Sequence, residues 1–320
     1  MIHVQNVTKL YGSKRAVDGI SFAVNKGEVL GFLGPNGAGK STTMRMVTGY
    51  TIPTAGKVEI QGHHVQENAV EAKKLIGYLP ENAPAYTDMS VYGFLKFAGA
   101  LRGLRGKTLR EAIDRAVELC FLQPVLHQSV DTLSKGYLHR TCFAQSIIHD
   151  PPVLVLDEPT DGLDPNQKHE VRSLIRKMGE TKAIVFSTHI LEEVEAVCTR
   201  AIIIDRGKIV ANGTPLELKN RSPKSGSVRA SFRGAPAEQA EAELKKLDSV
   251  AEVERLKVDS DGASYRVLPK KSGQTGLEES IYQLAASHKW TLTELTREEG
   301  RLDEVFRSIT LPEGAQTAAA

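Results

Sequence analysis

A glycine-rich loop that ends in a lysine and a serine carries the residue types needed to bind a nucleoside triphosphate. It reads GPNGAGKST over residues 34–42. Glycines let backbone N–H groups close around phosphate oxygens, and the partial positive charge of a helix N-terminus strengthens this binding. Lys40 would reach the β- and γ-phosphates, and the Ser41 hydroxyl would hold Mg²⁺. The predicted nucleotide-binding residues of this loop are Gly34, Pro35, Asn36, Gly37, Ala38, Gly39, Lys40, Ser41 and Thr42.

The segments on either side of the loop decide between two interpretations. Residues 28–33 read as a buried strand, and residues 42–47 read as the start of a helix. A glycine-rich turn with a surface lysine is the simpler alternative. Strand, glycine loop and helix in this order are, however, the context that the phosphate-binding motif requires. The sequence therefore predicts a nucleoside triphosphate site.

Two adjacent carboxylates follow a second apolar strand and could carry out hydrolysis. The run VLVLDE occupies residues 153–158. Asp157 stands where Mg²⁺ needs a ligand, and Glu158 is placed to polarise an attacking water as general base. The alternative is that both side chains only cap the next turn, which the phosphate-binding loop upstream makes the weaker interpretation.

The elements that must position these residues follow from periodicity. Alternation predicts strands at 1–8, 19–24 and 57–60, whereas the spacing between residues 90 and 150 is helical. From residue 153 onward short apolar strands alternate with helices, which indicates a parallel sheet covered on both faces. The predicted fold class is α/β: a core over residues 1–219 into which a helical subdomain of about 88–150 is inserted.

Four further motifs narrow the class. They are LSKGY at 133–137, DGLDP at 161–165, STH at 187–189 and Tyr11 within KLYG. Taken alone, LSKGY could be a serine-initiated helix, His189 a strand-end histidine and Tyr11 a core tyrosine. In this order and spacing they resemble the signature motif, D-loop, switch histidine and adenine-stacking aromatic of ATP-binding-cassette (ABC) ATPases. The resemblance covers residues 1 to about 218 and implies a P-loop ABC ATPase core.

The resemblance implies a site shared between two chains. Ser134 and Gly136 would face the γ-phosphate of ATP bound to the other copy, His189 would assist catalysis, and Tyr11 would stack on adenine. Two chains would pair head to tail as a homodimer, or this chain would pair with a related ATPase subunit. The implied ligands are ATP and Mg²⁺, and the implied partner is a polytopic membrane permease.

One residue departs from the usual pattern of the family. IGYLPE at 76–81 aligns with the Q-loop, where Glu81 replaces the common glutamine. Glutamate can still contact Mg²⁺ or the lytic water, but it adds negative charge beside the metal. The alternative is an ordinary loop carboxylate. Glu81, LSKGY and the segment 298–306 resemble a bacterial branch that drives multidrug-type exporters, which includes the gliding-motility-associated ATPase and the ATPase for copper-site maturation of nitrous oxide reductase.

The amino-acid composition indicates where the protein works and which classes of partner it does not bind. Lys and Arg total 41 and Asp and Glu total 39, which gives no support for binding nucleic acid. No apolar run approaches the roughly 18 residues of a membrane span, and the N-terminus lacks the pattern of a secretory signal. Three cysteines without a CxxC pair indicate free thiols in a reducing compartment. We expect a cytoplasmic protein held at the inner face of the membrane by its permease.

A second domain is expected after the core. A Pro/Gly/Ser-rich stretch at 220–227 reads as a linker, and the order β-α-β-β-α-β followed by a helix reads as an accessory α+β domain over 228–311. That order resembles a ferredoxin-like sandwich. A regulatory or dimer-supporting role is favoured, and a passive extension is the alternative. Residues 312–320 are expected to be a disordered tail.

The function predicted from these features is that of the ATP-hydrolysing subunit of a bacterial ABC exporter. ATP-driven dimerisation would energise a separate permease. The main alternative is a soluble ABC-type regulatory ATPase, but such proteins usually carry two cassettes or a long coiled coil. A second alternative is a scaffold that binds nucleotide without hydrolysis, which Glu158 and His189 argue against.

Overall fold

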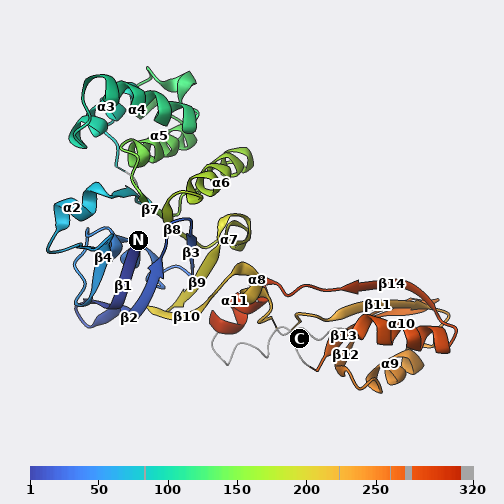
Figure 1. Ribbon diagram of the computed structural model, residues 1–320. Coiled ribbons are helices and arrows are strands. Elements are labelled where there is room, and N and C mark those ends of the chain that lie inside the picture. Colours follow the sequence, from blue (N-terminus) through green and yellow to red (C-terminus); the bar gives the residue numbers. More distant parts are fainter. Residues whose placement is uncertain (83, 223, 260, 271–275, 311–320) are drawn as a thin grey trace. The chain divides into compact units, whose positions relative to one another are not determined.

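The computed structural model describes residues 1–82, 84–222, 224–259, 261–270 and 276–310. It divides into two compact units, Met1–Thr214 and Pro215–Ala320 (Figure 1). The predicted tail at 312–320 lies outside the described residues. None of the helices in the described segments is both long and apolar enough to cross a bilayer.

The centre of the first unit is a six-stranded sheet in the order β10-β9-β3-β8-β7-β6. All neighbouring strands in it are parallel except β10, which is antiparallel to β9. The two strands next to β8 are buried along their whole length, as continuous apolar runs predict for a parallel sheet. The strands are β3 Val29–Leu33, β6 Ile76–Leu79, β7 Val153–Asp157, β8 Ala183–Thr188, β9 Arg200–Asp205 and β10 Lys208–Gly213.

A second, antiparallel sheet of the first unit has the order β2-β1-β4-β5. Its strands are β1 Ile2–Tyr11, β2 Lys14–Val24, β4 Ala55–Ile60 and β5 His63–His64. Strands β1 and β2 both extend beyond the predicted ranges, because they form a hairpin in which Tyr11 pairs with Lys14. The pairing carries the start of β2 to the nucleotide-binding loop, which alternation alone does not show.

Three helices form a separate layer of the first unit (Figure 1). They are α3 Val91–Leu101, α4 Gly106–Leu119 and α5 Lys135–Ile147, in the region where the spacing is helical. Two short 3₁₀ turns, Gln123–Val125 and Val130–Thr132, connect α4 to α5. The other helices of the unit are α1 Lys40–Val47, α2 Ala69–Lys74, α6 Pro165–Gly179 and α7 Leu191–Val197.

The second unit has the predicted order of a ferredoxin-like sandwich, with an antiparallel sheet β12-β13-β11-β14. Helices α9 and α10 lie on one side of this sheet (Figure 1). Its elements are α8 Pro215–Lys219, β11 Val228–Arg233, α9 Ala237–Lys245, β12 Val250–Asp259, β13 Gly262–Pro269, α10 Leu277–Ser287, β14 Thr291–Arg297 and α11 Leu302–Thr310.

The segment expected to be a linker lies inside the second unit. Ser222, Ser225 and Ser227 are buried. The Ser222 hydroxyl donates to Glu304 at 2.5 Å, and the Ser227 hydroxyl donates to Glu298 at 2.9 Å. Carboxylates of Glu304 and Glu298 therefore hold Ser222 and Ser227 in place, whereas the Ser225 hydroxyl donates to Asn220 Oδ1 at 3.3 Å. The second unit begins at Pro215 rather than after residue 219.

Glu298 is the centre of an ionic cluster within the second unit. Its carboxylate accepts hydrogen bonds from Arg266 at 2.5 Å, from Arg229 at 3.0 Å and from the Ser227 hydroxyl. These donors, Arg266 foremost, lower the pKa of Glu298 from 4.5 to about 2. Because the folded-state pKa is lowered, the stabilisation is complete above pH 4.5 and is lost as the pH falls toward 2.

We expect Glu298→Gln to lower the free energy of unfolding by about 2 kcal/mol at neutral pH, since the amide loses the charge that Arg266 and Arg229 pair with. Near pH 3 the variant and the wild type should differ much less. Denaturant unfolding of the full chain at both pH values measures this. Glu299→Gln, at the exposed neighbouring position, is the matched control. An equal difference at both pH values would contradict the assignment of the lowered pKa.

Candidate active site

The loop between β3 and α1 has the backbone that only glycine permits. A Cβ atom on Gly34 would lie 2.4 Å from the carbonyl oxygen of Ile204, and one on Gly39 would lie 2.7 Å from that of Ala16. Gly39 also has a φ of 109° and directly precedes the first residue of α1. The loop therefore presents backbone rather than side chains at the helix N-terminus, which suits anion binding.

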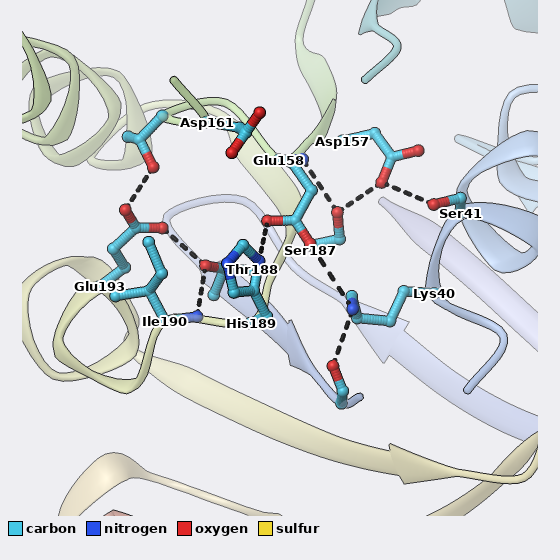
Figure 2. Close-up of polar contacts among 12 residues, drawn as sticks. Lys40, Ser41, Asp157, Glu158, Asp161, Ser187, Thr188, His189, Ile190 and Glu193 are labelled. Carbon is cyan, nitrogen blue, oxygen red and sulfur yellow. Dashed lines mark hydrogen bonds and ion pairs between the residues drawn. The ribbon is translucent and has the colours of Figure 1, made fainter. Parts of the chain in front are cut away.

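Lys40 is held at the entrance of this loop. Its side chain is almost fully buried, and its Nζ atom donates to the carbonyl oxygen of Gly34 at 2.7 Å. The same Nζ atom lies 3.5 Å from Oε1 of Glu158 (Figure 2). A cation fixed between the glycine loop and the carboxylate is placed to offset phosphate charge.

Asp157 ends β7 and accepts two hydroxyl hydrogen bonds. Its Oδ1 atom accepts from Ser41 Oγ at 3.2 Å and from Ser187 Oγ at 2.5 Å. Sequence reasoning did not assign Ser187 to the site. The signal lies in the strand register, because Asp157 and Ser187 are partners on β7 and β8. Ser187 Oγ also accepts from the backbone N–H of Glu158 at 3.0 Å, so one hydroxyl orients both carboxylate residues.

Glu158 and His189 form the second polar pair. Nδ1 of His189 lies 3.0 Å from Oε2 of Glu158, and the Glu158 side chain is only 11% exposed (Figure 2). The backbone of Glu158 has a φ of 51°, in the left-handed region that favours glycine. A shielded carboxylate with an imidazole beside it is the arrangement of a general base with an orienting partner.

Most of the glycine loop, Glu158 and His189 line one cleft of about 540 Å³. The predicted site residues Gly34, Ala38 and Asp157 are not part of its lining. Its lining includes five predicted parts of the site: Tyr11, the glycine loop, Glu81, Glu158 and His189. The lining residues are Tyr11, Lys14, Ala16, Pro35, Asn36, Gly37, Gly39, Lys40, Ser41, Thr42, Glu81, Glu158, Asp161 and His189. Tyr11 is 48% exposed and presents its ring to solvent at the cleft, as a stacking residue must. Lys14 and Ala16 were not predicted as site residues, because the alternation of the sequence predicts a strand only from residue 19, whereas β2 begins at Lys14.

Ser134 and Gly136 lie outside this cleft, at the N-terminus of α5. The exposed Ser134 caps the helix by accepting from the backbone N–H of Tyr137 at 3.3 Å. Gly136 is buried against α6, where an added Cβ would lie 2.4 Å from Oε1 of Gln167. Neither residue lines the cleft that contains the phosphate-binding loop, although the neighbouring Lys135 pairs with Asp161 of that lining at 3.4 Å.

The Ser41 hydroxyl and the Asp157 carboxylate fit a magnesium ion. Both are oxygen donors, which Mg²⁺ prefers, and they lie within 3.2 Å of each other. Glu81 lines the same cleft and is exposed.

A parallel sheet with a glycine loop, a buried lysine and a strand-end Asp-Glu pair defines a P-loop ATPase. The family model for ABC transporters matches residues 17–161. The chain is 30% identical to the linearmycin resistance ATP-binding protein LnrL of Bacillus subtilis (strain 168), over 97% of this chain and 98% of that protein. It is 38% identical to the Nod factor export ATP-binding protein I of Ralstonia nicotianae, over 68% of each chain.

A solved structure of an ATP-binding subunit of an ABC transporter superposes with a TM-score of 0.65 at 25% identity, covering 69% of this chain and 92% of that one. The chain therefore belongs to the ABC transporter family, and it is an ATP-binding subunit with the ATPase fold of that family.

Proposed function

We propose that two copies of this chain pair head to tail, hydrolyse ATP at two shared sites and thereby drive an exporter whose permease is a separate membrane protein. The observation that carries the proposal is that Ser134 is exposed and does not line the cleft that contains the other proposed catalytic groups. Lys40, Glu158 and His189 line the cleft, whereas the exposed Ser134 lies at the N-terminus of α5. Head-to-tail pairing would bring each half against its complement in the other copy.

Within each site the chain's own residues have distinct tasks. The glycine loop and Lys40 bind the phosphates, and Ser41 and Asp157 would hold Mg²⁺, which when bound neutralises charge on the phosphate oxygens. Glu158 accepts the proton of the attacking water, and His189 holds the Glu158 carboxylate in place. Tyr11 stacks on the adenine at the mouth of the cleft.

The export direction is supported by the names of the relatives. One is described as a Nod factor export protein and another as a linearmycin resistance protein. We infer that this chain likewise works at the inner face of the cell membrane, bound to a polytopic permease. A soluble regulatory ATPase is the second candidate, and a surface for the permease distinguishes the two.

The permease proposal is supported by a groove of about 570 Å³ that shares Glu81 with the nucleotide cleft. One wall comes from the loop after β6 and another from α3, with Tyr86, Phe94, Phe97 and Leu101 among the lining residues. The Tyr86 side chain is 54% exposed and its ring contacts the rings of Phe94 and Phe97. Glu81 lines both this groove and the nucleotide cleft. A short helix of the permease that occupies the groove would therefore lie one side chain away from the ATP site.

Two residues of the loop between β6 and α3 differ in exposure. Tyr86 is exposed, whereas Met89 is half-buried and packs against the core of the helical layer. We expect Tyr86→Ala to weaken permease binding by about tenfold or more, because an aromatic anchor at the centre of an interface contributes strongly. The ATPase activity of the isolated subunit should not change.

Permease binding is measured by co-purification of the polytopic partner from native membranes, and coupling is measured by transport in vesicles. Tyr282→Ala removes an equally exposed tyrosine of the second unit and is the control. Normal binding and transport in Tyr86→Ala and Met89→Ala would place the docking site elsewhere. If no membrane protein accompanies the wild-type chain, the regulatory alternative is favoured.

A further inference from the structure

A buried carboxylate lies behind the active site and joins the two segments that carry its catalytic residues. Glu193, in the first turn of α7, has a side chain that is 2% exposed. Its carboxylate bonds hydroxyls at the end of β8 and in the turn after β7 (Figure 2). It also pairs with Arg172 of helix α6. Sequence analysis assigned it no role.

The first connection fixes the segment that carries His189. Oε2 of Glu193 accepts a hydrogen bond from Thr188 Oγ1 at 2.7 Å. Because the Thr188 proton is committed to Glu193, the lone pairs of Oγ1 are free to accept, and they accept from the backbone N–H of Ile190 at 3.0 Å. The backbone on both sides of His189 is therefore held by one hydroxyl, whose orientation Glu193 determines.

The second connection fixes the turn that follows Glu158. Oε1 of Glu193 accepts a hydrogen bond from the Thr160 hydroxyl, which is buried. Within the same turn the N–H of Asp161 donates to the carbonyl oxygen of Glu158 at 3.1 Å, and that of Leu163 donates to the carbonyl of Thr160. Glu193 thus reaches the backbone of the general base from one side and the backbone of His189 from the other.

A purely structural role is the alternative, in which Glu193 only attaches α7 to α6. Arg172 of α6 does pair with Oε1 of Glu193 at 3.4 Å, which offsets the cost of burying the charge. The two helices have an independent connection, however, because Arg176 of α6 donates to the carbonyl oxygen of Ala196 on α7. Attachment of α7 does not explain why both oxygens of the carboxylate are used by hydroxyls of the two catalytic segments.

We propose that Glu193 is a positioning residue that holds the segment of His189 and the turn after Glu158 in a fixed relation to each other. The proposal rests on the ATP hydrolysis assigned to this site. The proposal has a consequence for the loop at 161–165, which begins next to Thr160. A displacement of that loop would move Thr160, and the Glu193 carboxylate would transmit the movement to Thr188 and the neighbouring His189.

The test is a double-mutant cycle on the full chain with Thr160→Val and Thr188→Val. These changes keep the branched shape of the side chain and replace each hydroxyl by a methyl group. Each should lower kcat about tenfold, because misplacing a catalytic group by a fraction of an ångström slows the chemical step. The affinity for a fluorescent ATP analogue should change by no more than about twofold, since neither residue lines the cleft.

The double variant should lose little more than the worse single variant, because both hydroxyls act through one side chain. Thr160→Ser and Thr188→Ser keep the hydroxyl and should restore kcat to within about twofold of the wild type. Glu193→Gln, which keeps the side-chain volume, should show the same loss of kcat and replaces either valine variant that does not fold.

Thr199→Val is the matched control. Its hydroxyl also bonds backbone groups, both belonging to Val29, but it lies beyond the other end of α7. The proposal is overturned if the valine variants lower only the melting temperature, as a structural role predicts, or if their losses of kcat multiply independently. If Glu158→Gln abolishes hydrolysis while both threonine variants behave like Thr199→Val, the proposal alone is wrong. Absence of ATPase activity in the wild-type chain would instead contradict the function itself.

Discussion

Glu158→Gln is expected to reduce ATP turnover by about 10²-fold or more while leaving ATP binding intact. The amide keeps the size of the side chain but cannot accept the proton of the attacking water. The phosphate contacts do not depend on it, because the glycine loop and Lys40 supply them. Hydrolysis would then be blocked in the bound state, and the variant should accumulate as an ATP-bound dimer.

Steady-state hydrolysis, binding of a fluorescent ATP analogue and size-exclusion chromatography with ATP measure these three effects. Glu180→Gln changes an exposed glutamate at the far end of α6 and should match the wild type in each. Near-normal turnover in Glu158→Gln would remove Glu158 from the mechanism. Loss of ATP binding would instead mean that Glu158 supports the loop through its contact with Lys40.

Mixing two inactive variants should restore activity if the sites are shared. Lys40→Ala is expected to weaken ATP binding at least about tenfold, because a charge-assisted contact with the phosphates is lost. Ser134→Arg should leave ATP binding to the free subunit intact. The arginine adds bulk and charge at the surface where the second copy must approach to complete the shared site. Each variant alone should be inactive as a dimer.

A mixed dimer has one site with both defects and one site with neither. With random pairing at equal concentrations, half of the dimers are mixed, so about a quarter of all sites are intact. ATPase activity near that fraction of the wild type is the expected result. Mixing Lys40→Ala with the double variant Lys40→Ala/Ser134→Arg leaves no intact site and is the control. An inactive mixture in which mixed dimers are shown to form would exclude the shared site.

The parts of the site that local spacing encodes could be predicted from the sequence. The strand, glycine loop and helix around Lys40 are contiguous, and Asp157 and Glu158 directly end a recognisable apolar strand. The parallel sheet followed from the same apolar runs. In each case the signal lies within a few residues of the side chain concerned.

The parts that depend on pairing between distant segments could not be predicted. Ser187 bonds Asp157 only because β7 and β8 pair in one particular register, and Glu193 meets Thr160 only through the packing of α7. The serines at 220–227 have the composition of a linker, yet Ser222 and Ser227 bond carboxylates 82 and 71 residues away in the sequence. Amino-acid composition predicts whether a segment is exposed only when the segment has no distant partners. Here the hydrogen bonds to distant carboxylates allow a polar, linker-like segment to be buried.

The left-handed backbone at Glu158 implies a conflict between folding and activity at this position. A residue with a side chain lowers the free energy of unfolding by about 1 kcal/mol at this position relative to glycine, because glycine adopts a φ of 51° without steric strain. The residue best suited to the backbone is therefore one that cannot act as a base. Under the proposed mechanism, hydrolysis needs the glutamate although glycine would relieve the backbone strain. A laboratory search for thermostable variants is therefore expected to select substitutions that also remove the proposed base.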